Sequence, residues 1–117
     1  MLNAVQPGSY IRPHRHSNPP KSESIVVLQG RITLVIFSDD GSVDRYFDLQ
    51  AGTHRFGADL EPDVFHTFFA TAADTVLYEA KTGPYEPGSD KDFASWAPEE
   101  FSKESRVYLE NLTKQTT

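Results

Sequence analysis

The feature that most constrains the fold is a succession of short apolar segments divided by turn residues. "ESIVVLQG" is followed at once by "RITLVIF", and Gln29–Gly30 between them is typical of a tight β-hairpin. Asp40–Gly41 marks a second turn, after which "VDRYFDL" alternates as a third strand. "VFHTFFA" and "DTVLYEAK" predict another strand pair. Short strands with turns throughout favour an all-β domain, either an antiparallel barrel or a sandwich.

The 117 residues suffice for one domain with a single core, and 38% of them are hydrophobic. We expect the barrel to occupy about residues 5–81, with "GADLEPD" as a loop inside it. The segment 82–113 is rich in Pro, Gly and Asp at its start and predicts a loop followed by a helix that begins near Pro98. One face of that helix is expected to carry Phe101, Tyr108 and Leu112.

Composition excludes several classes of function. The formal charge of −6 disfavours a nucleic-acid partner, because its phosphates would repel the chain. The apolar runs are strand-sized and too short to span a bilayer, and "MLNAVQPGSY" lacks the pattern of a signal peptide. There is no cysteine, which excludes disulfides and thiol catalysis and leads us to expect a cytoplasmic protein. Any metal site must therefore be built from His, Asp, Glu, Asn or Gln.

Two histidines one residue apart are the strongest candidates for chemistry. Side chains two apart in an extended strand point to the same side, so one face would carry Tyr10, Arg12, His14 and His16. Glu23 opens the next strand and His66 lies on a later one, so both could join the histidines around a divalent cation. Such an ion would offset the cost of a carboxylate near the interior. The alternative is a pair of solvated histidines on an edge strand, with His66 hydrogen-bonded in the core and Glu23 at the surface.

Other side chains are candidates for the same cavity. The predicted substrate contacts are Tyr10, Arg12 and Tyr85. Arg12 could hold a carboxylate or phosphate group, or instead pair with a surface acid. Tyr85 could close the pocket, or simply pack the C-terminal segment against the barrel. Glu79 and Lys81 share one face of "TVLYEAK" and could form a catalytic acid–base pair or a solvated ion pair. His54 is expected to be exposed or to face the substrate.

Taken together, these residues resemble the two motifs of the cupin superfamily, whose fold is a small jelly-roll β-barrel. The first motif runs from Gly8 to Gly30, and the second leads from Pro62 to His66. The resemblance implies four metal ligands: His14, His16, Glu23 and His66. The spacer "SNPPKS" has six residues and is longer than the usual cupin spacer, so Glu23 is either the fourth ligand or a bystander. The second motif lacks its usual glycine and has Ala70 where asparagine is common.

A narrower resemblance covers most of the chain. The strings "PGSYIRPHRH", "FSDDG" and "EAKTGPYEPGSDKDFASWAPEE" are similar to those of the WbuC family of cupin-fold metalloproteins. That family is associated with bacterial O-antigen and surface-polysaccharide gene clusters, which implies a sugar or nucleotide-sugar ligand. Three histidines and a carboxylate suit one divalent transition-metal ion, namely Zn, Fe, Mn, Ni or Co. Analogy with small cupins further implies a homodimer.

Several functions stay open at this point. The first is a metal-dependent isomerase, epimerase or lyase that acts on a small carbohydrate. The second is an Fe(II) dioxygenase, and the third is a non-enzymatic protein that binds or senses a sugar or another metabolite. A metal-free sugar-nucleotide ketoisomerase is disfavoured, because it would not need the His-x-His ligands. The sequence contains no dedicated general base that would choose between these functions.

Overall fold

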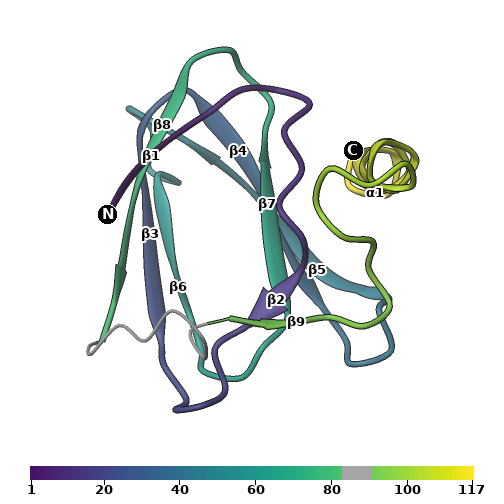
Figure 1. Cartoon of the computed structure of the whole chain (residues 1–117). Helices are drawn as coiled ribbons and strands as arrows, with labels where there is room; N and C mark the ends of the chain where they lie inside the picture. The colour runs from purple at the N-terminus through teal and green to yellow at the C-terminus, as the bar shows by residue number, and fades with distance from the viewer. Residues whose placement is uncertain (83–90) are drawn as a thin grey trace.

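The computed structural model describes residues 1–82 and 91–117, which form two antiparallel β-sheets and one helix (Figure 1). One sheet has four strands in the order β1-β8-β3-β6, and the other has five in the order β5-β4-β7-β2-β9. The elements are β1 (Leu2–Val5), β2 (His14–Arg15), β3 (Glu23–Gln29), β4 (Arg31–Phe37), β5 (Val43–Gln50), β6 (Gly57–Leu60), β7 (His66–Ala70), β8 (Thr75–Lys81), β9 (Asp92–Phe93) and α1 (Ser105–Gln115). The sheets face each other as a jelly roll with α1 outside it, so the predicted all-β class with a C-terminal helix is confirmed.

The main core lies between the two sheets. Its members are the buried side chains Val5, Ile25, Val27, Ile32, Leu34, Ile36, Leu49, Leu60, Phe68, Ala70 and Leu77. On β3 the inward positions alternate with outward ones, so Ile25 and Val27 share their face with Glu23. The register that buries the aliphatic side chains therefore also buries the Glu23 carboxyl group, which is only 3% exposed.

A second core explains why β4 is a continuous apolar run rather than an alternating one. Residues from Ile32 to Phe37 are all buried, because β4 faces the barrel on one side and is covered on the other. The covering cluster joins the outer face of the five-stranded sheet to the C-terminal segment, and it consists of Val35, Phe37, Phe65, Phe69, Ala94, Ala97, Leu109 and Leu112. The single helix thus packs on one sheet only, as Figure 1 shows. Among the described residues, no helix is long and apolar enough to cross a membrane.

Three sequence predictions about the elements are wrong. "GADLEPD" contains strand β6, whose pairing with β3 was hidden by the glycine and the acidic residues around it. The residues from Leu2 to Val5 form β1 at the edge of the four-stranded sheet, so the barrel begins earlier than residue 5. The helix begins at Ser105 rather than near Pro98, and Phe101 lies before it with a positive φ of 64° and a fully exposed side chain.

Candidate metal centre

Three buried histidines converge between the sheets. His14 on β2 lies directly opposite His66 on β7 in the strand register, and their ring centroids are 4.6 Å apart. His16 follows β2 and points to the same side, because it lies two positions after His14. One ligand atom from each of the three rings lies within 4.8 Å of the others, and each side chain is at most 4% exposed. The sequence pattern thus produces a compact cluster of three imidazoles.

Hydrogen bonds and burial prepare two of these rings to bind an ion. The Nδ1 atoms of His14 and His66 lie 2.9 Å from the carbonyl oxygens of Arg12 and Val64. A proton on each Nδ1 would leave Nε2 with a free lone pair, an arrangement typical of histidine ligands. Burial, followed by repulsion from His66, lowers the pKa of His14 to about 3, and burial also lowers the pKa of His66. Both imidazoles are therefore neutral at neutral pH, as metal binding requires.

Glu23 lies beside the three histidines despite the long spacer. The segment "SNPPKS" closes as a turn, with a bridge between Ser17 and Pro20 and a hydrogen bond from the Lys21 amide to the His16 carbonyl. This turn absorbs the extra residues and brings Glu23 Oε2 to 2.8 Å from His16 Nε2 and 3.8 Å from His66 Nε2. The carboxyl group thus lies beside two of the three histidines, and its part as a fourth ligand stays a prediction.

The residues present fit a divalent transition ion. Metal–nitrogen bonds of about 2.0–2.1 Å in a tetrahedral site place the nitrogens about 3.4 Å apart. The ligand atoms lie within 4.8 Å of one another, so they need to approach by at most about 1.4 Å. His66 Nε2 is buried and has no hydrogen-bond partner among the residues that the structure describes. A buried polar atom of this kind is costly unless a ligand satisfies it. The donor set is neutral imidazole plus carboxylate, which suits Zn, Fe, Mn, Ni or Co.

Glu79 adds a second carboxyl group beside this cluster. On β8 it lies opposite Ile25, and Glu23 lies opposite Lys81, so the two acids are diagonal neighbours on the inner face. Burial, a hydrogen bond shared with Glu23 and repulsion by its charge raise the pKa of Glu79 to about 7. The pKa of Glu23 falls below its ordinary value, because hydrogen bonds from His16 and Glu79 outweigh the effect of burial. The pair therefore holds one proton near neutral pH, carried by Glu79.

A cavity of about 260 Å³ leads from the surface to these side chains. It lies along β1, at one edge of the four-stranded sheet, and its polar lining includes His14, Glu23, Glu79, Lys81 and Lys91. The predicted pair Glu79 and Lys81 thus lines the same cavity as two of the predicted ligands. Its volume is slightly below the ~300 Å³ lower bound of pockets for drug-sized ligands, so it suits a group the size of one sugar ring.

Tyr10 makes contacts other than the predicted ones. Alternation placed Tyr10 on the histidine face, but its ring packs on Tyr108 of α1 and its hydroxyl donates a 2.7 Å hydrogen bond to the Pro98 carbonyl. The segment before β2 is not a regular strand, so the two-residue alternation does not extend back to Tyr10. A part for Tyr10 in substrate binding stays a prediction.

Arg12 is not among the described residues that line this cavity. The Arg12 guanidinium donates to the Ala94 carbonyl at 3.0 Å and lies 5.2 Å from the centre of the Phe93 ring, so it fixes the chain after β9. Tyr85 lies outside the described residues. Contact of either side chain with a substrate stays a prediction. His54 is exposed on the loop between β5 and β6, away from the three buried histidines.

Two cavity residues were not foreseen from the sequence. Asn3 donates a short hydrogen bond from its side-chain amide to Glu79 Oε2, and Lys91 lowers the pKa of Glu79 through its charge. Asn3 was missed because β1 was not recognised as a strand, so its face was never assigned. Lys91 lies in the string "SDKDF" between turn-forming residues, where no periodicity indicates a direction.

The proton on Glu79 leads to a prediction about stability and pH. Its pKa rises from 4.5 in the unfolded chain to about 7, so the folded state binds the proton more tightly and loses stability as pH rises from about 4.5 through 7. Between pH 5 and pH 8, we expect the free energy of unfolding of metal-free wild-type protein to fall by about 1–2 kcal/mol more than that of Glu79→Gln. Partial exposure of Glu79 to solvent keeps the difference this small. Urea unfolding in the presence of a chelator measures this difference.

The comparison with Glu79→Gln isolates the contribution of Glu79 to the pH dependence of stability. The buried histidines make both proteins more stable as pH rises, so their contribution cancels in the difference. The pKa of His14 falls from 6.5 in the unfolded chain to about 3, so its neutral form supports the fold above about pH 6.5 and this contribution is lost as pH falls towards 3. The lowered pKa of His66 acts in the same direction. A stability difference between the two proteins that stays constant from pH 5 to pH 8 would show that Glu79 does not titrate in this range.

Comparison with known proteins identifies the fold. Residues 1–49 match a family model described as a domain of unknown function (DUF6016), which is less than half of the chain. None of the curated proteins compared matches the sequence. Among solved structures, NovW, a 4-keto-6-deoxy sugar epimerase from the novobiocin biosynthetic gene cluster of Streptomyces spheroides, superposes with a TM-score of 0.66 at 15% identity. The match covers 80% of this chain and 49% of NovW, so the chain spans about half the length of that relative.

Two further structures give the same result. The capsular polysaccharide assembling protein CapF from Staphylococcus aureus has a TM-score of 0.63 at 19% identity, with 79% of this chain and 25% of CapF covered. QdtA, a sugar 3,4-ketoisomerase from Thermoanaerobacterium thermosaccharolyticum solved in complex with TDP, has a TM-score of 0.61 at 13% identity. That match covers all of this chain and 74% of QdtA. At these identities the similarity establishes a cupin-like jelly-roll fold and does not establish an activity.

Proposed function

We propose that this protein is a metal-binding cupin that acts on a small carbohydrate or nucleotide-sugar ligand. The observation that carries the proposal is the convergence of three buried imidazoles beside Glu23, and two of these four residues, His14 and Glu23, line a cavity of about 260 Å³. Two of those imidazoles have lowered pKa values, and His66 has a buried nitrogen without a hydrogen-bond partner among the described residues. The similar structures include a sugar epimerase and a sugar ketoisomerase, which supports a sugar-type ligand.

The chain's own residues suit proton-transfer chemistry. A bound divalent ion would polarise a carbonyl group or lower the pKa of a bound water. Glu79, with a pKa of about 7, can exchange a proton with a ligand at neutral pH, and Asn3 holds its carboxyl group in place. Lys91 at the cavity adds a positive charge for an anionic group of the ligand. These features favour an isomerase, epimerase or lyase over a protein that only binds its ligand.

The finer resemblance to the WbuC family and a place in surface-polysaccharide metabolism belong to the same proposal. They rest on the sequence strings around the first motif and before α1, and on the description of CapF as a capsular polysaccharide assembling protein. A cytoplasmic location is part of this proposal too, because nucleotide-sugar ligands are made inside the cell.

A thermal-shift screen with metal-loaded protein tests the ligand class. We expect dTDP, dTDP-glucose or a sugar acid such as galacturonate to raise Tm by several degrees, since a ligand at a hundred times its Kd adds about 2.7 kcal/mol. The shift should vanish in His14→Ala/His16→Ala protein. If no carbohydrate probe changes Tm while the metal still binds, the ligand is not a carbohydrate. That outcome would not contradict the proposed metal centre.

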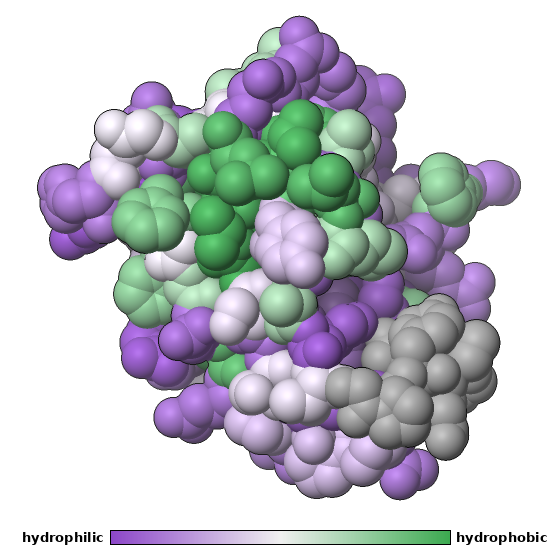
Figure 2. All heavy atoms as spheres, turned by 90° about the vertical axis from the view of Figure 1, so that its left-hand side faces the viewer, coloured by the Kyte–Doolittle hydropathy of each residue, from purple (hydrophilic) through white to green (hydrophobic). Residues whose placement is uncertain are grey.

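We place the proposed homodimer interface on one particular surface. The outer face of the four-stranded sheet carries a continuous apolar patch (Figure 2), in which Leu2, Leu28, Phe56 and Tyr78 are 45–65% exposed. Val26 lies opposite Tyr78, which in turn lies opposite Leu2, so their side chains form one row across three strands. A two-fold dimer brings the same surface of both copies together, so that surface must be complementary to itself. An apolar patch without charges meets this requirement, although the chain as a whole has a net charge of −6.

Tyr78→Asp is expected to separate the two copies. Light scattering coupled to gel filtration should give twice 13.1 kDa for the wild type and 13.1 kDa for the variant. Tyr46→Asp is the matched control, because Tyr46 is also 45% exposed but lies on β5 of the other sheet. A monomeric wild type, or dissociation by Tyr46→Asp alone, would refute this assignment of the interface.

A further inference from the structure

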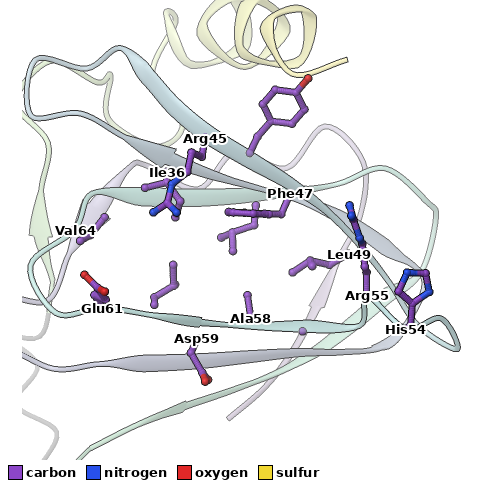
Figure 3. A pocket seen from close by; sticks show the side chains of 14 residues that line it. Ile36, Arg45, Phe47, Leu49, His54, Arg55, Ala58, Asp59, Glu61 and Val64 are labelled. Atoms are coloured by element: carbon purple, nitrogen blue, oxygen red, sulfur yellow. The ribbon is translucent and has the colours of Figure 1, made fainter.

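A second cavity, of about 680 Å³, opens between β5 and β6 (Figure 3). These strands are edges of the two different sheets, so the cavity lies on the opposite side of the barrel from the one beside β1. Its volume falls within the range of about 300–1,000 Å³ that is typical of small-molecule sites. Neither the candidate metal ligands nor Glu79 line it.

The inside of this cavity is largely apolar. Its aliphatic lining consists of Leu34, Ile36, Leu49, Ala58, Leu60 and Val64, and Phe47 adds an aromatic ring. In the strand registers Ile36 lies opposite His66, and Leu60 lies opposite Glu23, so these two side chains stand between the cavity and the candidate metal centre. Such a surface offers no hydrogen bonds to the hydroxyl groups of a sugar and would instead bury the hydrocarbon part of a ligand.

The rim of the cavity carries both positive and negative side chains, and its arginines are better placed than its acids to contact a ligand. Arg55 lies at one end and Arg45 at the other, as Figure 3 shows. Within the described part of the chain, the Arg55 guanidinium makes no ion pair or hydrogen bond. Arg45 has an exposed contact with Asp44 at 3.4 Å and lies 5.9 Å from the centre of the Phe47 ring. Of the acids, Asp59 points away from the cavity and accepts a 2.6 Å hydrogen bond from Ser24. Glu61 is the one remaining carboxylate of the lining.

We propose that this cavity binds a small amphipathic carboxylate, with its aliphatic or aromatic body among the leucines and its carboxylate at Arg55 or Arg45. Burial of the body contributes about 25 cal/mol per Å² of apolar surface. A charge-assisted hydrogen bond to a guanidinium fixes the orientation of the anion. The site is chemically different from the cavity beside the histidines, and it does not depend on a bound metal.

Octanoate is a suitable probe, with 1-octanol as its uncharged counterpart. In nitrogen–proton correlation spectra of the full chain, octanoate should shift the amide signals of Ala58, Leu60 and Val64 in a saturable manner. Arg45→Ala/Arg55→Ala should weaken octanoate binding at least tenfold and leave 1-octanol binding unchanged. Arg106→Ala is the control, because it removes an exposed arginine of α1 that does not line the cavity.

Filling the cavity provides an independent arm of the experiment. Ala58→Phe places a ring inside it and should weaken both octanoate and 1-octanol at least tenfold, and the correlation spectrum reports whether this variant is folded. The proposal is overturned if octanoate shifts only the amides around His14, if it shifts none, or if the double arginine variant binds octanoate as tightly as the wild type.

Discussion

Replacing His66 with alanine is expected to lower the affinity for a divalent transition ion at least a hundredfold. His66 is one of the three clustered imidazoles, opposite His14 in the register and 3.8 Å from the Glu23 carboxylate. Loss of a group that only orients a ligand costs about 10–100-fold in affinity, so loss of a ligand itself should cost more. Competition with a fluorescent chelator, using Zn²⁺ and Co²⁺ as probes, measures the change.

His54→Ala is the matched control for this prediction. It also removes one imidazole, but His54 is exposed on the loop between β5 and β6, so affinity should stay within about twofold of the wild type. Circular dichroism of each variant shows whether the fold is retained. If His66→Ala and His54→Ala bind Zn²⁺ equally well, the ion is not held by the buried cluster.

Gly30→Ala is expected to lower the free energy of unfolding by about 2–5 kcal/mol. Gly30 connects β3 to β4 with a φ of +84°, where a side chain costs about 1–2 kcal/mol. A Cβ atom there would also lie 2.3 Å from Thr75 Oγ1 and 2.9 Å from Thr75 Cα, so β8 would have to move. Overpacking of this kind typically costs a further 1–3 kcal/mol. Urea unfolding monitored by Trp96 fluorescence measures the loss.

Gly52→Ala separates the two contributions. Gly52 has a φ of +77°, and a Cβ atom there would have no neighbour within 4 Å, so only the backbone cost of about 1–2 kcal/mol should appear. The excess loss in Gly30→Ala then measures how tightly the hairpin packs on Thr75. Equal losses at the two positions would mean that this hairpin is free to move away from β8.

Much of the barrel could be predicted because its strands carry strong local patterns. The β3–β4 hairpin follows from "ESIVVLQGRITLVIF" alone, and β7 and β8 follow from their apolar and β-branched residues. Strand β6 could not be predicted, because "GADL" pairs with β3 through backbone hydrogen bonds that its side chains do not reveal. Phe101 was misplaced for a similar reason: helical spacing indicated a buried face, but the local backbone turns away before the helix begins.

The candidate site was predictable where it depends on alternation and not where it depends on packing. His14 and His16 share a side because they are two residues apart, and Glu79 and Lys81 face inward for the same reason. The unusual pKa of Glu79 needs its diagonal contact with Glu23, which only the strand register supplies. The position of Glu23 could not be predicted from the sequence, because the spacer before it is long. The spacer folds into a tight turn, which becomes visible only in the three-dimensional structure.

The metal content of purified protein without a histidine tag tests most directly whether the three histidines form a metal centre. Elemental analysis should find about one transition-metal ion per chain in the wild type. His14→Ala/His16→Ala protein, prepared in parallel, should retain less than about a tenth of that amount. If both proteins carry equally little metal, and neither takes up Zn²⁺, Co²⁺, Ni²⁺, Mn²⁺ or Fe²⁺ when it is supplied, the buried histidines are not a metal centre.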